Sequence, residues 1–314
     1  MVYTRPPPTE GMAYARSMAT EHHEREAFIT DPVSVVVRRA GSGSGHVADP
    51  LAVFRCLWQH REVVWEMARR DVLSRYRGST LGIVWSFCLP LMMLAIYALV
   101  FGVVFQTRWG AATGGRTEFP IIFFAGLIVY TYFAECVTRA PTLVLSHPAY
   151  VKRILFPLEV LPWVLTGSAL FHVGVSFAVL LLVQSTLHGP PAWSALTLPL
   201  VLAPCVLFTM ALSWVLASLG VYFRDTVQTV GLFTMAVLFM SPVFYPVSSL
   251  PEPLREWVWL NPLTFPIEQV RAVIFLGEAP RWGGLAMAWA AGLVAAWGGL
   301  FWFQKTRPGF ADVL

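Results

Sequence analysis

The sequence is short of lysine, and this shortage excludes one class of activity. Its 314 residues include only two lysines, Lys152 and Lys305, among 22 basic residues. A Walker A loop needs a lysine directly after a glycine, because that lysine reaches the phosphates held by the loop backbone. Lys152 follows Val151 and Lys305 follows Gln304. No P-loop can be formed, so any ATP-driven work requires a partner chain.

Charge of either sign is also scarce. Charged residues make up 13% of the chain and hydrophobic residues 56%, whereas about 25% of an ordinary soluble domain is charged. This composition is typical of a protein that crosses a membrane several times. The net charge of +4 is not concentrated in a basic patch interleaved with aromatics, so nucleic-acid binding is not predicted.

The motifs of common active sites are missing as well. The four cysteines form no CxxC pair, so neither a disulfide nor a metal site is expected. HExxH, GxSxG and paired carboxylates are absent. We expect a chain without catalytic residues or a cofactor, although a membrane-embedded glycan-modifying enzyme with unfamiliar motifs remains an alternative. No early apolar segment predicts a cleaved signal peptide.

Long apolar segments dominate what is present. Each is long enough to cross ~30 Å of hydrocarbon as a helix, the form that satisfies its own backbone polar groups in lipid. We predict an all-α integral membrane protein, with a disordered cytoplasmic tail over 1–48, a membrane domain over 79–308 and a cytoplasmic C-terminus over 309–314. The six predicted spans cover about 81–105, 119–139, 157–187, 193–223, 226–247 and 282–304.

The segment 49–78 has the pattern of an amphipathic helix. Asp49 and Pro50 suit the N-cap and first helical position, and apolar residues then recur at steps of about four. We interpret the segment as a helix lying in the membrane interface, although a helix packed in a soluble core has the same periodicity. The residues expected at the interface are Trp58, Trp65, Arg69, Arg70, Arg75 and Arg77.

The basic residues near the span ends predict the orientation. One side receives the arginines of 69–77, Arg139, the pair at 152–153, Arg224 and the basic residues of 305–307. The other side has fewer, and they are mixed with glutamates. Because loops rich in lysine and arginine stay in the cytoplasm, both termini are expected there.

Few charged residues fall inside the predicted spans. Glu135 and Arg139 are four residues apart, which favours a structural ion pair on one helix face; an ion or proton pathway is the alternative. His172 lies alone among apolar residues, which favours a packing role over a catalytic one.

Two loops have unusual composition. In the cytoplasmic loop, Pro148 can begin a short helix that carries Tyr150, Lys152 and Arg153. Such a helix suits docking into a cleft of another protein, and an ordinary positive-inside connector fits equally well. The outer loop after the fifth span is rich in proline and aromatics, and Pro251 and Pro266 are each expected to open a short helix. Two half-buried helices are predicted, which lie at the outer interface or re-enter the membrane. Broken helices at membrane depth are tolerated only against protein or a water-filled cavity.

Five motifs together resemble those of the permease of ABC-2 type polysaccharide exporters. These exporters transport O-antigen, capsule and teichoic acid. The resemblance covers roughly residues 30–314. The motifs are "RDVLSRYRGSTLGIVWSFCLPLMMLAIYALVFGVVF", "VKRILFPLEVLP", "GVYFRDTVQTV", "SPVFYPVSSLPEPLREWVWLNPL" and "RPGFADVL".

The resemblance implies a homodimer of six-span subunits in the bacterial inner membrane. Two ATPase subunits, which hold the ATP and magnesium, would drive a lipid-linked polysaccharide outward. It also implies that the ATPase couples to the short helix of residues 148–156, with Pro148, Tyr150, Lys152 and Arg153 as the contact. The outer re-entrant helices of the family match residues 250–280.

Two further questions stay open from the sequence. Phe244, Tyr245, Trp257 and Trp259 near the outer mouth are candidates for lining a glycan path, or they form an interfacial aromatic belt in lipid. The segment 49–78 is an alternative ATPase contact. The competing transport function is an ABC-2 drug or lipid exporter.

Overall fold

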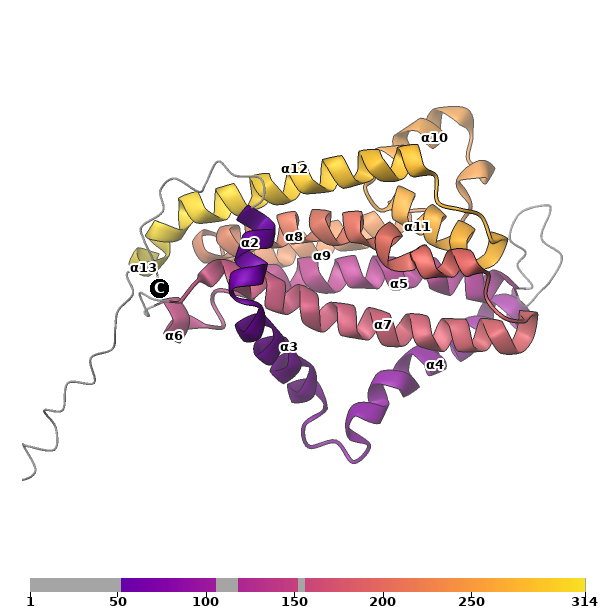
Figure 1. The fold of residues 1–314 in the computed structure, drawn as a ribbon, viewed down its shortest axis with the longest axis horizontal. Coiled ribbons are helices and arrows are strands. Elements are labelled where there is room, and N and C mark those ends of the chain that lie inside the picture. Colours follow the sequence, from indigo (N-terminus) through magenta and orange to yellow (C-terminus); the bar gives the residue numbers. More distant parts are fainter. Residues whose placement is uncertain (1–51, 106–117, 152–155, 314) are drawn as a thin grey trace, which may run out of the picture. The chain divides into compact units, whose positions relative to one another are not determined.

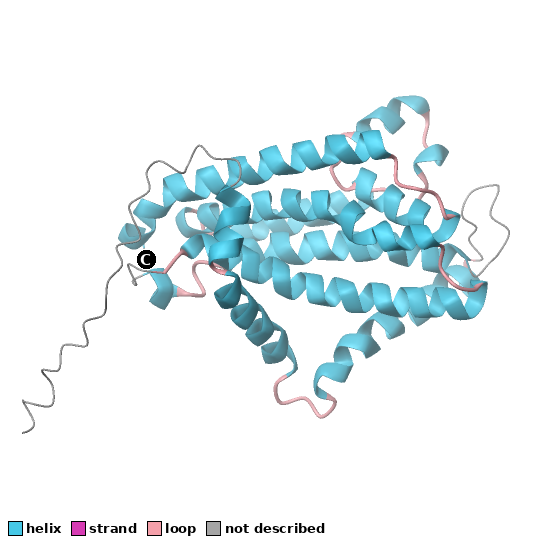
Figure 2. Ribbon diagram, viewed as in Figure 1, coloured by secondary structure: helices cyan, strands magenta, loops and turns pink. Residues whose placement is uncertain are grey.

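The protein is all-helical, as its sequence predicts. The computed structural model describes residues 52–105, 118–151 and 156–313, and every regular element in those ranges is a helix or helical turn (Figures 1 and 2). Five helical segments in the described part are long and apolar enough to cross a membrane. The tail at 1–48, the predicted helix start at Asp49–Pro50, and the pair Lys152 and Arg153 lie outside the described residues.

Long helices form most of the bundle (Figure 1). The long helices are α4 (Trp85–Tyr97, extended by a 3₁₀ turn at Gly82–Val84 and a π-helical segment at Ala98–Val104), α5 (Glu118–Arg139), α7 (Leu161–His188), α8 (Leu198–Tyr222) and α12 (Trp282–Thr306). The shorter ones are α2 (Ala52–Gln59), α3 (Arg61–Tyr76), α6 (Pro148–Val151), α9 (Thr226–Met240), α10 (Glu252–Trp259), α11 (Thr264–Arg271) and α13 (Phe310–Val313). Among the shorter helices, α9 lies beside α5 and α8 within the bundle, and α10 and α13 lie at opposite ends (Figure 1).

Helix α5 lies at the centre of the bundle, where it contacts α7, α8, α9 and α11. Of its most apolar stretch 72% is buried, whereas the corresponding figure for Gly82–Val104 is 6%. Helices α8 and α12 approach closely because small residues face each other: a Cβ on Gly299 would overlap the backbone of Ala211. Small residues at such contacts are typical of helices packed within a membrane, where hydrophobic burial gives no drive to associate.

The predicted fifth span is shorter than expected. Helix α9 ends at Met240. Ser241 precedes Pro242 and has an extended backbone (φ −88°, ψ 146°), the conformation that a following proline favours. Its 15 residues rise only about 22 Å at 1.5 Å per residue. Residues 241–246, which were predicted to belong to this span, form a non-helical segment instead, and a 3₁₀ turn at Val247–Ser249 follows before α10. The total of six crossings stays a prediction.

The predicted amphipathic segment forms two helices, α2 and α3, which meet at His60. Helix α3 packs on α7 through Val64, Ala68 and Val72. Trp58 and Trp65 are each 73% exposed, so they project away from the bundle. The buried face of α3 therefore consists of small apolar residues, and both tryptophans remain available to the surroundings.

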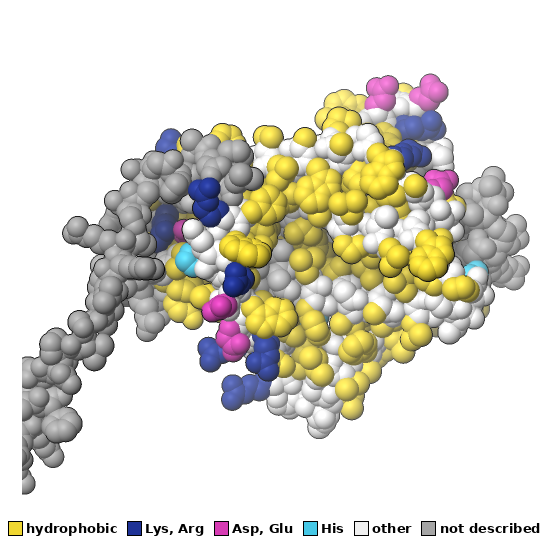
Figure 3. All heavy atoms as spheres, viewed as in Figure 1, with side chains coloured by type: hydrophobic (Ala, Val, Ile, Leu, Met, Phe, Trp, Pro, Cys, Tyr) yellow, Lys and Arg dark blue, Asp and Glu magenta, His cyan; other side chains and the backbone are white. Residues whose placement is uncertain are grey.

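The two ends of the bundle differ in charge. We call the end formed by the C-termini of α5, α8 and α12 the basic end, because Arg139, Arg224, Lys305 and Arg307 lie there. The opposite end carries α10 and α11 (Figure 1), and the sequence there contains both arginines and glutamates. Figure 3 shows hydrophobic side chains over the middle of one face and charged side chains toward its two ends.

Candidate functional site

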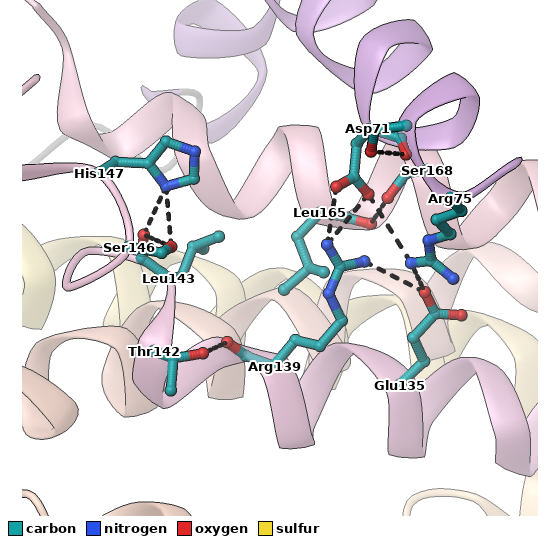
Figure 4. A network of polar contacts seen from close by, with 11 residues as sticks. Asp71, Arg75, Glu135, Arg139, Thr142, Leu143, Ser146, His147, Leu165 and Ser168 are labelled. Carbon is teal, nitrogen blue, oxygen red and sulfur yellow. Dashed lines mark hydrogen bonds and ion pairs between the residues drawn. The ribbon is translucent and has the colours of Figure 1, made fainter. Parts of the chain in front are cut away.

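Four charged residues connect α3 to α5 near the basic end (Figure 4). Arg139 donates through Nη2 to both carboxylate oxygens of Asp71, at 2.9 and 3.0 Å. Its Nη1 donates to Oε1 of Glu135 at 3.2 Å. Arg75 forms an ion pair with the same Glu135 oxygen and lies 3.7 Å from Asp71. We call Asp71, Arg75, Glu135 and Arg139 the four-charge network.

The network lowers the pKa of Asp71. Partial burial of this carboxyl opposes its ionisation, but hydrogen bonds from Arg139 and Ser168 and the charges of Arg139 and Arg75 outweigh burial, and the pKa falls below its usual value. Charge-assisted and bidentate contacts of this kind are the stronger class of hydrogen bond. The network therefore fixes α3 against α5 whenever Asp71 is ionised.

Glu135 and Arg139 are the predicted ion pair, and Arg75 is predicted at the interface. Asp71 is not among the predicted residues, although it precedes Arg75 by one helical turn, the spacing that lets opposite charges meet. His172, expected to pack, lies on α7 with Nδ1 3.4 Å from the Tyr76 hydroxyl. Among the described residues no group of histidine, cysteine and carboxylate side chains is arranged to hold a metal. The network is suited to positioning helices, since both of its carboxylates are engaged by arginines and it joins α3 to α5.

The loop that carries α6 is held together by stacked rings. Tyr150 stacks on Phe156 with ring centroids 4.4 Å apart and on His147 at 5.5 Å. His147 is oriented by Ser146 Oγ at 3.0 Å and by the Leu143 carbonyl at 2.9 Å (Figure 4). The Tyr150 ring is thus engaged inside the loop. Of the four residues expected to contact a partner, Pro148 and Tyr150 lie within the described range, while Lys152 and Arg153 do not.

Both ends of this loop are anchored to the bundle. At its start, the backbone of Pro141 lies so close to α8 that a Cβ on Gly220 would overlap the Pro141 carbonyl. At its end, Arg307 donates to Glu159 Oε2 at 2.9 Å and to the Phe156 carbonyl at 3.1 Å. The fully buried Trp214 also donates to the Glu159 carbonyl at 3.1 Å. A force on α6 would therefore reach α8 and α12 through direct contacts.

At the opposite end, one buried arginine holds the break after α9. The side chain of Arg271 is 6% exposed, and it donates to the carbonyls of Pro242 at 2.6 Å, Val243 at 2.8 Å and Ile122 at 3.2 Å. It also pairs with Glu268 at 3.0 Å. Backbone carbonyls that leave a helix need other donors when they are buried, and this guanidinium supplies them. The sequence does not indicate this role of Arg271, because three of its partners are backbone carbonyls of distant segments.

The four aromatics expected along a glycan path have different environments. Phe244 packs against Phe123 and Phe239, with centroids 5.2 and 5.7 Å apart. The Tyr245 hydroxyl donates to the Phe239 carbonyl at 3.2 Å. Trp257 is 73% exposed on α10, while Trp259 is 43% exposed and borders two cavities. Among the described residues, no ring contact joins any two of these four aromatics.

Comparison with known proteins gives one family and several relatives. A sequence profile described as ABC-2 type transporter matches residues 62–275. The O-antigen export system permease protein RfbA of Myxococcus xanthus is 26% identical over 264 residues, which cover 83% of this chain and 99% of that protein.

Two further relatives are more distant. The O-antigen export system permease protein RfbA of Klebsiella pneumoniae is 24% identical over 249 residues, covering 79% of this chain and 93% of that protein. The polysialic acid transport protein KpsM of Escherichia coli is 20% identical over 209 residues, covering 66% of this chain and 79% of that protein.

Proposed function

This chain belongs to the ABC-2 type transporter family, and we propose that it is the permease subunit of an ATP-driven polysaccharide exporter. Its cargo would be a lipid-linked glycan of the O-antigen or capsular type. It would act in the bacterial inner membrane as a homodimer with both termini in the cytoplasm. A separate pair of ATPase subunits would bind ATP and magnesium.

One observation carries this proposal. The similarity to an O-antigen export permease runs along 83% of this chain and 99% of the relative, so it involves the membrane domain as a whole. The family profile alone would suit a drug or lipid exporter equally well. The absence of a glycine–lysine pair for a P-loop is the reason for assigning ATP hydrolysis to a partner.

The loop around α6 is the proposed entry point for the energy of hydrolysis. It lies at the basic end, which the positive-inside rule assigns to the cytoplasm, and Pro141 and Arg307 connect it to α8 and α12. Helix α3 is the alternative contact, because the four-charge network joins it to the same end of α5.

Deletion of the gene tests the function directly. We expect the deletion strain to lose its surface polysaccharide and to accumulate lipid-linked glycan in the inner membrane, and the intact chain to restore both. Unchanged surface glycan together with new sensitivity to toxic compounds would favour a drug exporter. A glycan that still reaches the surface with altered structure would favour a modifying enzyme.

A further inference from the structure

A polar cavity lies between α10, α11 and the segment that leads into α12. Its volume is about 330 Å³, within the range of ~300–1,000 Å³ usual for small-molecule sites. Its walls include side chains from three separate segments of the chain. Those that matter here are Arg255, Trp259, Glu268, Gln269, Glu278 and Arg281.

Part of the hydrogen-bonding capacity in this cavity is unused. Arg255 donates through Nη2 to the carbonyls of Ser248 and Leu250, at 3.2 and 3.1 Å, but its Nε is buried and has no partner. The side chains of Glu278 and Arg281 form no ion pair with any other residue of the described ranges. Buried polar groups are normally paired, so the free Nε of Arg255 indicates a missing ligand atom or water.

The kinds of polar group in the wall select the chemistry of the ligand. A guanidinium only donates hydrogen bonds, a carboxylate only accepts them, and the Gln269 amide does both. Glu268 is already paired with Arg271, which also lines the cavity. Of the remaining charges, Glu278 would repel an anion, and Arg255 and Arg281 would repel a cation. A sugar hydroxyl donates and accepts at the same oxygen, so a neutral polyhydroxyl ligand suits both sets of groups.

An aromatic ring adds an apolar wall. Trp259 lines this cavity and also a neighbouring apolar one of about 460 Å³. Tryptophan combines a large flat apolar face with a single polar N–H, which suits the C–H face of a sugar ring whose hydroxyls point toward the polar wall. An aromatic wall would add no favourable contact to a cavity that held only water.

We propose that this cavity binds one neutral sugar unit of the exported glycan. The proposal rests on the proposed function and makes it more specific, because it names a site and the charge class of the sugar. The positive-inside rule assigns this end to the outer side, so the site would hold the glycan after it has crossed. Arg271 lines the cavity and also donates to the carbonyls after α9. A ligand in the cavity would therefore affect the position of the segment after α9.

The test uses the full chain in lipid nanodiscs and saturation-transfer difference NMR. The probes are methyl α-D-glucopyranoside, methyl α-D-mannopyranoside and, as the anionic comparison, methyl α-D-glucuronoside. The cavity variants are Glu278→Gln and Trp259→Ala. The matched controls are Glu256→Gln on α10 and the 88% exposed Trp193→Ala, neither of which lines the cavity.

We expect a neutral glycoside to bind and each cavity variant to weaken it about fivefold, the effect of losing one hydrogen bond or its equivalent in contact. The control variants should bind as the natural chain does. Absence of binding by both neutral glycosides, equal loss in the controls, or tighter binding of the glucuronoside would each overturn the proposal.

Export assays separate this proposal from the proposed function. In cells, Glu278→Gln should lower the rate at which new glycan reaches the surface while membrane levels of the chain stay normal. Normal export by both cavity variants, in a strain whose gene deletion abolishes surface glycan, would overturn the sugar site and leave the exporter intact. Normal surface glycan in the deletion strain would overturn the exporter itself.

Discussion

Arg139 lies between two carboxylates from different helices, and this position gives Asp71 its importance. Arg139 contacts both oxygens of Asp71 and one of Glu135. Removing one partner of a charge pair leaves the other partly desolvated and unpaired, which costs more than the pair contributes when intact. Both side chains retain some exposure, 36% for Arg139 and 26% for Asp71, so solvent screening reduces the effect.

Asp71→Asn should lower the stability of the chain by about 1 kcal/mol near neutral pH. The pKa of Asp71 is lowered in the folded chain, so its contribution is present above the unfolded pKa of about 3.9. It is lost as the pH falls through the lowered folded value. Thermal unfolding in detergent should therefore separate the variant from the natural chain at pH 5 to 8, with a smaller difference as the pH falls below 4.

The control is Asp225→Asn, since Asp225 is exposed at the start of α9 and forms no ion pair among the described residues. A difference that persists undiminished at the lowest pH would show that the Asp71 charge is not the cause.

Arg271 differs from Arg139 in that three of its acceptors are backbone carbonyls. Its three backbone acceptors come from α5 and from the break after α9. Lysine carries a single point charge on a flexible stem and cannot reproduce the planar fork of donors. Gly126 makes space for the guanidinium, because a Cβ at that position would lie 2.6 Å from Arg271 Nη2.

Arg271→Lys and Arg271→Gln should both loosen the segment after Met240. Unmade hydrogen bonds to buried carbonyls cost about 1–3 kcal/mol each, so the yield of folded protein should fall, with the larger fall for glutamine. Hydrogen exchange should be faster at 241–250 in the surviving protein. Gly126→Ala should act in the same direction but more weakly, and protection equal to that of the natural chain in all three variants would contradict this role.

Helix α6 is too short to be stable alone. The conformation of the loop that carries it therefore depends on packing against the rest of the chain. Isolated helices of this length do not persist in water. The stack of Tyr150 on His147 and Phe156, with the anchors at Gly220 and Arg307, holds it in place. Tyr150 therefore shapes the loop in addition to any contact with a partner.

Tyr150→Asp should abolish export while the chain and its ATPase still reach the membrane. A carboxylate cannot stack on Phe156, so the loop would lose its shape, and ATP hydrolysis would be uncoupled from transport or the ATPase would not bind. Export and co-purification of the ATPase are the measurements. Tyr150→Phe keeps the stack and should export normally.

Lys152→Ala and Arg153→Ala should act more mildly, since exposed charge pairs contribute under about 1 kcal/mol. Normal export and co-purification of the ATPase in Tyr150→Asp would make the loop a mere connector and would favour α3 as the contact.

At the scale of the whole molecule, the two ends of the bundle are chemically distinct. The basic end carries arginine and lysine at three helix C-termini, and the opposite end mixes both signs around α10 and α11. An excess of lysine and arginine marks the cytoplasmic side. We therefore propose one orientation for the whole bundle, with the basic end in the cytoplasm.

Single cysteines should report this orientation. On a background in which all four native cysteines are replaced, cysteines at positions 112 and 254 should react with an impermeant thiol reagent in intact spheroplasts. Cysteines at positions 150 and 312 should react only after the membrane is opened. Reaction at position 150 from outside would reverse the orientation and remove the α6 loop as an ATPase contact.

Much of this protein follows from properties that act locally along its sequence. Hydropathy located the long helices, because a helix in lipid must be apolar over its whole length. Pro242 favours the end of α9, since a proline restricts the residue before it, although Pro90 and Pro204 lie inside α4 and α8. The uneven arginines predicted the two different ends. The composition also excluded a P-loop, because this requires a residue pair that the chain lacks.

The tertiary structure decided which distant residues meet. Asp71 contacts Arg139 across 68 positions, and Arg271 contacts the Ile122 carbonyl across 149. Such pairs depend on how helices cross and on where a glycine admits a side chain, which no local period encodes. For the same reason four aromatics that look alike in sequence have different surroundings, and only Trp259 borders the polar cavity.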